Sequence, residues 1–336
     1  MKFNRMGESA LMVSELCLGA MMFGDQTDED QAKRIVDAAR HHGVNFIDTA
    51  NVYAYGESEA QLGRMLAGQR DQWIIATKVG ASMKQGAIEG TNSRHRIMLE
   101  AERSLGRLNT DRIDIYYLHV DDLETPLDEP IRAMGDLIAA GKVRYWGMSN
   151  AYAWRIAEMA LTADSLGVPR PVAVQMGYSA VNRVMEQEHI PACLQLGIGF
   201  VAYSPLARGI LSGKYAQGVE PPEDSRAGRN DPRIMTTEYR DESLDIAVKI
   251  KKHAESRGMT TAEFAVKWVL NNPAVSSVIG GPRTMDQWQG YVSALEHDFT
   301  TEDEAFVDAL VPAGFNSTPF YGDPKLPPRG RQGPAE

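Results

Sequence analysis

The chain has 336 residues, 43% hydrophobic and 24% charged, which is an ordinary composition for a globular protein with a full core. Its net charge of −10 disfavours nucleic acid or an acidic membrane surface as a partner, because both require a dominant basic face. No run approaches the roughly 20 apolar residues that a membrane-spanning helix needs.

The predicted elements alternate along most of the chain. Phe3–Arg5 and Leu11–Val13 predict a short hairpin that would close the floor of a barrel. From about residue 16 to about residue 295, short apolar runs alternate with amphipathic segments of helix length. The predicted strands are Leu16–Leu18, Asn45–Asp48, Trp73–Thr77, Ile113–Leu118, Val143–Met148, Val172–Gln175, Phe200–Tyr203 and Ser277–Ile279. Helices predicted between them include Asp30–His41, Arg94–Leu108 and Trp154–Leu166.

The strand runs are almost continuously apolar, which is typical of parallel strands buried on both faces. Eight strand–helix units favour the α/β class, and within it a closed (β/α)8 TIM barrel over an open doubly wound sheet.

A long polar segment, Lys214–Arg240, follows the seventh predicted strand. Its Pro221, Pro222, Gly228 and Pro232 are expected to break any helix. Insertions of this length are either disordered loops or functional lids. No linker and no second core is visible, so we expect one barrel domain over residues 1–311. The remaining residues, 312–336, are predicted to form an irregular Pro-rich tail.

Four polar side chains follow the ends of consecutive predicted strands. Asp48 and Tyr53 follow the second, Lys78 the third and His119 the fourth. Each alone has an ordinary structural reading, for example a cap or a solvated charge. Active groups of such barrels lie at the carboxyl ends of the strands, so the four together predict one site.

These residues resemble the signature of the aldo-keto reductases, Asp48-Thr-Ala-x-x-Tyr53 with Lys78 and His119 at the next two strand ends. The resemblance extends from about residue 3 to about residue 311. It also includes Gly147-Met-Ser149-Asn150, Val174-Gln175, Tyr203-Ser-Pro-Leu206 and Gly281-Pro-Arg283-Thr284. The spacing after Tyr53 is similar to the branch that contains potassium-channel β-subunits and bacterial sugar-aldehyde reductases.

The resemblance implies metal-independent, NADPH-dependent reduction of aldehydes or ketones. Tyr53 would donate the proton to the carbonyl oxygen, and Lys78 would lower the pKa of this phenol from about 10. Asp48 would hold Lys78 by a charge-assisted hydrogen bond. His119, in its neutral form, would orient the carbonyl. Tyr55 is a rival for the acid, but the spacing of the family selects Tyr53.

The resemblance also assigns contacts with NADP(H). Ser149, Asn150 and Gln175 would bind the nicotinamide carboxamide, and Tyr203 would stack on the ring. The residues expected to line the pyrophosphate are Ser204, Leu206, Arg208, Gly209 and Lys214. Those expected to open the last helix, whose amino terminus favours an anion, are Gly281, Arg283, Thr284 and Gln287. Near the adenine, where the family often has Asn, this chain has Tyr291.

Three other functions compete with this interpretation. A Rossmann dehydrogenase is suggested by Gly197-Ile-Gly199-Phe-Val-Ala202, but that string precedes a strand instead of following one. A metal-dependent hydrolase would need clustered ligands, whereas the seven histidines are scattered. A cofactor-binding regulatory subunit with low turnover remains open.

The sequence does not identify the substrate or the oligomeric state. Met22, Phe23, Met83 and Val120 follow strand ends and suggest a partly apolar pocket for a small carbonyl compound. The amino-terminal residues lack the apolar core of a signal peptide. Cys17 and Cys193 lack the spacing of metal ligands. We therefore expect a cytoplasmic protein without a disulfide scaffold or zinc site.

Overall fold

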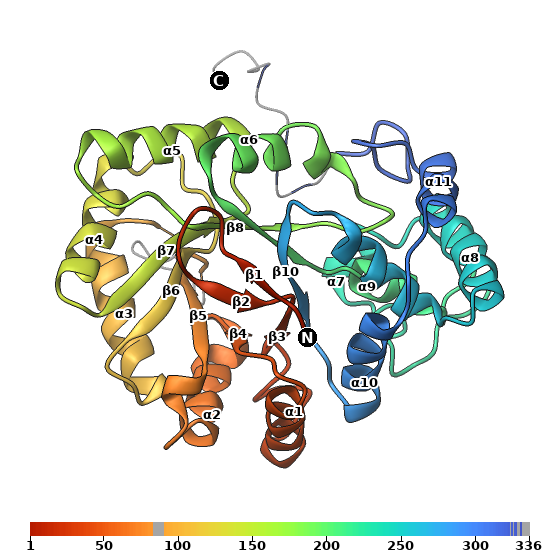
Figure 1. Ribbon diagram of the computed structural model, residues 1–336, viewed down its shortest axis with the longest axis horizontal. Helices are drawn as coiled ribbons and strands as arrows, with labels where there is room; N and C mark the ends of the chain where they lie inside the picture. The colour runs from red at the N-terminus through yellow and green to blue at the C-terminus, as the bar shows by residue number, and fades with distance from the viewer. Residues whose placement is uncertain (83–90, 323, 325, 328–329, 331–336) are drawn as a thin grey trace.

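The computed structural model describes residues 1–82, 91–322, 324, 326–327 and 330. Eight parallel strands close a barrel in the order β10-β3-β4-β5-β6-β7-β8-β9, which confirms the predicted TIM barrel (Figure 1). The strands are β3 (Leu16–Gly19), β4 (Phe46–Asp48), β5 (Ile74–Val79), β6 (Ile113–Leu118), β7 (Val143–Ser149), β8 (Ala173–Gly177), β9 (Gly199–Tyr203) and β10 (Val275–Gly280).

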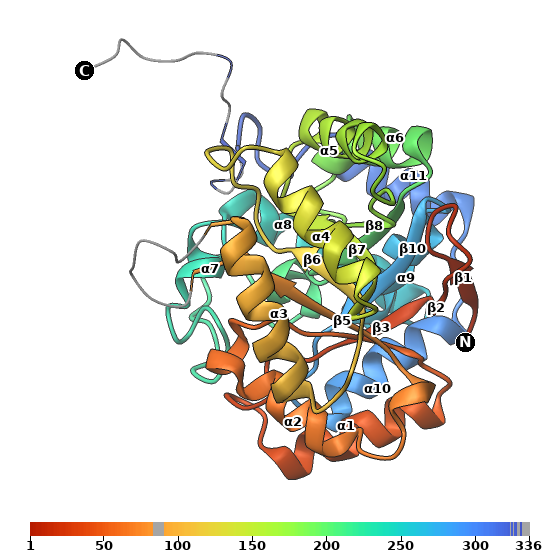
Figure 2. The ribbon, with the colours of Figure 1, turned by 90° about the vertical axis from the view of Figure 1, so that its left-hand side faces the viewer.

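Helices surround the barrel on the outside, as Figures 1 and 2 show. They are α1 (Glu29–His41), α2 (Glu57–Met65), α3 (Arg94–Leu108), α4 (Asp128–Ala139), α5 (Ala153–Ser165), α6 (His189–Leu196), α7 (Pro232–Met235), α8 (Asp241–Ser256), α9 (Thr261–Asn271), α10 (Met285–Ser293) and α11 (Thr301–Leu310). The predicted helix Arg94–Leu108 is α3 residue for residue; Asp30–His41 begins one residue later than α1, and Trp154–Leu166 is shifted by one residue from α5.

Helix α1 shows why these segments form where they do. The Asp28 side chain caps the helix by accepting a hydrogen bond from the Gln31 amide at 2.8 Å. Ala32, Ile35, Val36 and Ala39 recur at helical spacing and are buried against the barrel. The position of the helix therefore follows from a cap and one apolar face.

The predicted hairpin is present as β1 (Phe3–Arg5) and β2 (Met12–Ser14). Met6 and Val13 are buried in the cluster that fills the barrel interior, together with Phe46 and Tyr117. The Asn4 side chain donates a hydrogen bond to the Ser276 carbonyl at 3.0 Å. In Figure 2 the hairpin lies at one end of the barrel and α7 at the other. The hairpin thus closes the floor and leaves the carboxyl ends of the strands for a site.

Two helix predictions are corrected by the structure. Pro232 does not break a helix but begins α7, where a proline loses no intrahelical hydrogen bond, and Asp231 caps that helix. The helix that follows Gly281 and Arg283 is not the last one. Helix α11 comes after it and begins with a reciprocal capping box between Thr300 and Asp303.

The Gly197–Ala202 string does not have the structural context of a Rossmann fingerprint, which lies between a strand and the helix that follows it. Gly197 ends α6 with a φ of +68°, and Gly199 opens β9. The string therefore joins a helix to a strand, as expected from the sequence.

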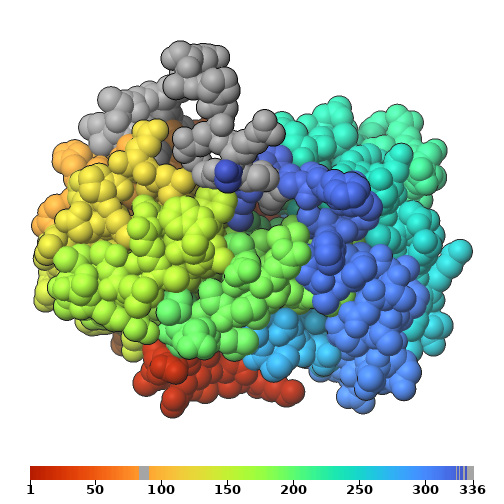
Figure 3. All heavy atoms as spheres, turned by 90° about the horizontal axis from the view of Figure 1, so that it is seen from above, coloured from red at the N-terminus to blue at the C-terminus, as the bar shows by residue number. Residues whose placement is uncertain are grey.

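The described residues after Val311 have no regular secondary structure, only an isolated bridge between Asn182 and Asn316. This part of the tail packs beside the segment after α7, where the Arg240 guanidinium lies 3.8 Å from the centre of the Tyr321 ring (Figure 3). The boundary at residue 311 remains a prediction. Within the described residues, no helix is both long and apolar enough to cross a membrane.

Candidate active site

The site is built around one buried ammonium group, that of Lys78 on β5. Its Nζ atom donates to Asp48 Oδ1 at 2.5 Å, to the Thr49 carbonyl at 2.7 Å and to the Tyr53 hydroxyl at 3.4 Å. The Lys78 side chain is fully buried, and Asp48 lies at the end of the neighbouring strand β4. Three of the four predicted catalytic residues, Asp48, Tyr53 and Lys78, are therefore in contact through the Lys78 ammonium.

Tyr53 reaches Lys78 because the chain after β4 turns sharply through a 3-10 segment, Tyr53–Gly56. Ala54, Tyr55 and Gly56 adopt positive φ angles of 47°, 55° and 96°. L side chains rarely adopt the φ angle of Gly56, so glycine is favoured there. The turn leaves Tyr55 80% exposed. Of the two rival tyrosines, Tyr53 is the one beside Lys78.

Buried polar contacts hold both sides of this turn. The Asn51 amide donates to the Glu100 carboxylate on α3 at 2.8 Å. The Thr49 and Ser58 hydroxyls are 2.8 Å apart. Glu100 and Ser58, which lie outside the Asp48–Tyr53 motif, thus help to hold the strained backbone of the turn in place.

His119 completes the group at the end of β6. Its backbone amide donates to the Val79 carbonyl at 2.7 Å, which ties it to the strand that carries Lys78. Its ring meets the Tyr53 ring edge to face, with 5.8 Å between the centroids. The structure brings the imidazole and the phenol to the same mouth of the barrel.

The pKa of Tyr53 differs from the sequence expectation. Burial raises the pKa of the phenol above its ordinary value, and the nearby Lys78 ammonium offsets this only in part. The lowering of this pKa by Lys78 that the sequence predicts is present, but burial of the phenol, which the sequence does not show, outweighs it. Burial acts to lower the pKa of Lys78, but Asp48 and Tyr53 outweigh it and raise the pKa. Both groups keep their protons near neutral pH.

Four residues predicted to bind nicotinamide form one hydrogen-bonded chain. The Tyr203 hydroxyl donates to Asn150 Oδ1 at 2.7 Å, and Asn150 Nδ2 donates to Ser149 Oγ at 3.0 Å. Ser149 Oγ donates to the Gln175 carbonyl at 2.8 Å. The side-chain amide of Gln175 then donates to Asp48 Oδ2 at 2.8 Å. The chain connects directly to the Asp48 carboxylate, which is predicted to be catalytic.

The residues predicted to line the pyrophosphate follow β9 in a tight turn. Ser204, Arg208 and Gly209 have φ angles of 57°, 56° and 112°. The Lys214 ammonium lies beside Gly209, 3.6 Å from the position that a Cβ atom on this residue would occupy. The Arg208 guanidinium, in contrast, is paired with Glu238 at 2.8 Å. Leu206 is partly buried against the core. Of the residues predicted to line the pyrophosphate, the backbone turn and the exposed Lys214 are the ones best placed to contact a ligand.

The residues predicted near the adenine ribose lie after β10. Thr284 caps α10, and Gln287 Oε1 accepts a hydrogen bond from the Arg283 amide at 2.8 Å. The Arg283 guanidinium donates to the Asp224 carbonyl at 3.3 Å, and Gly281 is exposed. Tyr291 is buried beneath Gly280, and burial raises its pKa to about 12. The Tyr291 ring therefore packs against Gly280 at the end of β10.

The apolar pocket expected from the sequence is only partly right. Phe23 is fully buried in the core and Met22 nearly so, because the turn after β3 folds them inward. Met21 and Val120 are partly exposed. Met83 lies outside the described residues. Met21, which the sequence did not predict, is partly exposed there.

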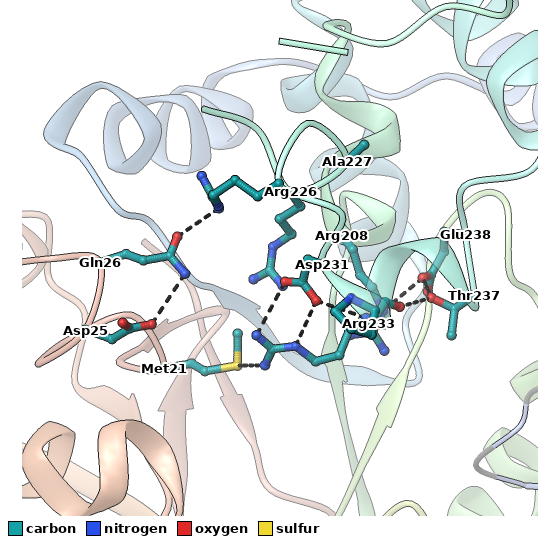
Figure 4. A network of polar contacts seen from close by, with 12 residues as sticks. Met21, Asp25, Gln26, Arg208, Arg226, Ala227, Asp231, Arg233, Thr237 and Glu238 are labelled. Carbon is teal, nitrogen blue, oxygen red and sulfur yellow. Dashed lines mark hydrogen bonds and ion pairs between the residues drawn. The ribbon is translucent and has the colours of Figure 1, made fainter. Parts of the chain in front are cut away.

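A cluster of arginines around the mouth was not predicted. Asp231 lies between Arg226, at 3.2 Å, and Arg233, at 3.4 Å (Figure 4). Burial lowers the pKa of Arg226, and the charges of Arg233, Arg208 and Arg283 lower it further. The sequence signal was the recurrence of arginine within the polar segment 214–240. Arg208, Arg226 and Arg283, together with the glycine turn and the convergent amide groups, fit a phosphate-bearing nicotinamide cofactor.

Comparison with known proteins agrees with this geometry. Residues 15–312 match the model of the Aldo/keto reductase family. A probable voltage-gated potassium channel subunit beta of Arabidopsis thaliana is 36% identical over 301 residues, which is 88% of this chain and 92% of that protein. The rice counterpart, from Oryza sativa, shows the same identity and coverage. The uncharacterized oxidoreductase YrpG of Bacillus subtilis is 35% identical over 332 residues, 95% of this chain and 98% of that protein.

Proposed function

The chain belongs to the aldo/keto reductase family, and from this we propose that it reduces aldehyde or ketone carbonyls to alcohols with NADPH. The observation that carries the proposal is the buried Lys78 ammonium in contact with both Asp48 and the Tyr53 hydroxyl. This arrangement suits transfer of one proton to an oxygen on which negative charge develops.

Each residue of the group has a role in the proposal. Tyr53 is the general acid, since burial keeps its phenol protonated. Lys78 stabilises the phenolate that remains after the proton leaves, and Asp48 holds Lys78 in place. His119, beside the Tyr53 ring, hydrogen-bonds the carbonyl oxygen and orients it.

Bound NADPH would supply the hydride. Asn150, Gln175 and Ser149 offer amide and hydroxyl groups to a carboxamide, and the Tyr203 ring offers a stacking face. Lys214, Gly209 and the turn at Ser204 suit a pyrophosphate, and Arg283 suits the phosphate that distinguishes NADPH from NADH. We further propose that the protein acts in the cytoplasm.

A second candidate is a regulatory subunit that binds the cofactor with little turnover. It is favoured by the 36% identity to two plant proteins described as probable potassium channel β-subunits. Oxidation of NADPH with a panel of aldehydes, ketones and sugar aldehydes separates the two. Turnover at about 1 s⁻¹ or faster, the usual range of enzymes, supports the reductase. Tight NADPH binding without turnover on any member of the panel supports the subunit.

A further inference from the structure

Arg233 crosses the mouth of the barrel from α7. Its Nη1 atom lies 3.8 Å from the sulfur of Met21, two residues beyond the end of β3 (Figure 4). A thioether is only a weak acceptor, whereas a guanidinium has five N–H donors. The Arg233 side chain is 50% exposed. It therefore keeps donors that an incoming ligand can use.

The charge of Arg233 is not fully compensated. Asp231 is the one carboxylate within ion-pair distance of it among the residues that the structure describes, and its Nε–Oδ1 separation is 3.4 Å. Arg226 shares the same carboxylate at 3.2 Å. One negative charge thus faces two guanidinium groups. A net positive charge remains at the mouth of a chain whose overall charge is −10.

Arg233 also lies close enough to the proton donor to act on it. Its charge lowers the pKa of the Tyr53 phenol, although burial has the larger and opposite effect. Such an interaction weakens with distance and with screening by water. Met21 and Tyr53 follow the paired strands β3 and β4, so the cation and the phenol lie on the same side of the barrel mouth.

The other arginines of the cluster point elsewhere. Arg208 is paired with Glu238 at 2.8 Å, Arg226 with Asp231 at 3.2 Å, and Arg283 contacts the Asp224 carbonyl at 3.3 Å. Arg233 extends to Met21, whose sulfur is a weak acceptor. It is the guanidinium best placed to meet the substrate instead of the cofactor.

On the basis of the function proposed above, we propose that the carbonyl substrates of this protein carry an anionic group, a carboxylate or a phosphate, which Arg233 binds. Nε and Nη2 of Arg233 contact Asp231 at 3.4 Å, and the Nη1–Nη2 edge of the planar guanidinium can hold either group with two parallel hydrogen bonds. Binding there fixes the distance between the anionic group and the carbonyl that Tyr53 protonates. Arg233 is thus a specificity-determining residue.

The test compares 4-carboxybenzaldehyde with its uncharged methyl ester, using wild-type protein and Arg233→Gln. The substitution should lower kcat/KM for the acid by about 10- to 100-fold, mainly through KM, which is the range expected for one hydrogen-bonded ion pair. It should leave the ester and the Kd of NADPH unchanged. Arg233→Lys should retain part of the preference, because it keeps the charge but not the planar fork.

Arg229→Gln is the matched control. It removes a cation from the same segment, but Arg229 contacts Gln26 and the Asp224 carbonyl. The ratio between acid and ester should therefore stay at the wild-type value. Equal losses for both aldehydes in Arg233→Gln would overturn the proposal. So would weaker NADPH binding in step with the kinetic loss, since the cation would then serve a cofactor phosphate.

A binding measurement separates this proposal from the proposed function. If the wild-type protein reduces neither these two aldehydes nor any member of the panel, the reductase assignment fails, and calorimetry with 4-(hydroxymethyl)benzoate and NADP⁺-loaded protein still tests Arg233. At least tenfold weaker binding to Arg233→Gln than to wild type supports the anion site. Equal binding to the two proteins contradicts it.

Discussion

Gln175 donates its side-chain amide to the carboxylate of Asp48, with 2.8 Å between Nε2 and Oδ2. The other oxygen of Asp48 accepts from Lys78 at 2.5 Å. One buried carboxylate therefore joins the residue predicted to bind nicotinamide to the group predicted to handle the proton. The stability of the pocket and its chemistry depend on the same contacts.

Asp48→Asn should destabilise the protein strongly, because it leaves the Lys78 ammonium buried without a carboxylate. Removing one partner of such a pair costs about 3–5 kcal/mol in the free energy of unfolding. Urea denaturation of Asp48→Asn, Lys78→Met and the double variant measures this. The free energy of unfolding of the double variant should fall by much less than the sum of the decreases in the two single variants.

Asp37→Asn is the comparison for that series, since it breaks the exposed Lys33–Asp37 pair on α1. It should change the stability little. If the losses of Asp48→Asn and Lys78→Met were simply additive, the two side chains would not be coupled.

The pH dependence of reduction should reflect the buried phenol. Because burial raises the pKa of Tyr53, the proton donor stays protonated throughout the neutral range. The single-turnover rate of carbonyl reduction should be level from about pH 6 to about pH 9 and fall only near or above about pH 10, the ordinary value for tyrosine. Rapid-mixing fluorescence of NADPH measures the rate. A descending limb near pH 7 would mean that another group donates the proton.

Arg283→Ala should weaken NADPH and spare NADH, since the two cofactors differ only by one phosphate. Arg283 precedes α10, and its amide is already held by Gln287. Loss of a hydrogen bond to a charged group costs about 1.5–3 kcal/mol, or roughly ten- to a hundredfold in Kd. Fluorescence titration with both cofactors checks the prediction. Equal weakening would show that Arg283 supports the loop without recognising the phosphate.

The segment Lys214–Arg240 is predicted to act as a flap that orders over bound cofactor. It already contacts the loops that follow two neighbouring strands, β10 through Arg283 with Asp224 and β3 through Arg229 with Gln26. Closing loops of this kind often limit release of product or cofactor. Hydrogen exchange should slow across residues 216–231 when NADPH is added. The same protection in both states would leave an ordinary surface loop.

The barrel could be predicted from the sequence because its strands are buried on both faces and are nearly continuous apolar runs, as in Ile113–Leu118, which only Asp114 interrupts. The grouping of the four predicted catalytic residues could be predicted because strand ends converge by topology. Pro232 was misread because a proline that ends one helix can begin another. The cation at Arg233 was missed because its role depends on how Asp231 is shared with Arg226, which is a tertiary contact.

The central claim is that Tyr53 delivers the proton, and single-turnover reduction of an aldehyde by Tyr53→Phe and Tyr55→Phe tests it most directly. Tyr53→Phe should slow the reaction by about 10²- to 10⁴-fold, the usual contribution of a general acid, while NADPH binds almost as before. Tyr55→Phe should match the wild type, since Tyr55 is 80% exposed. A wild-type rate in Tyr53→Phe, with a loss in Tyr55→Phe, would contradict the account.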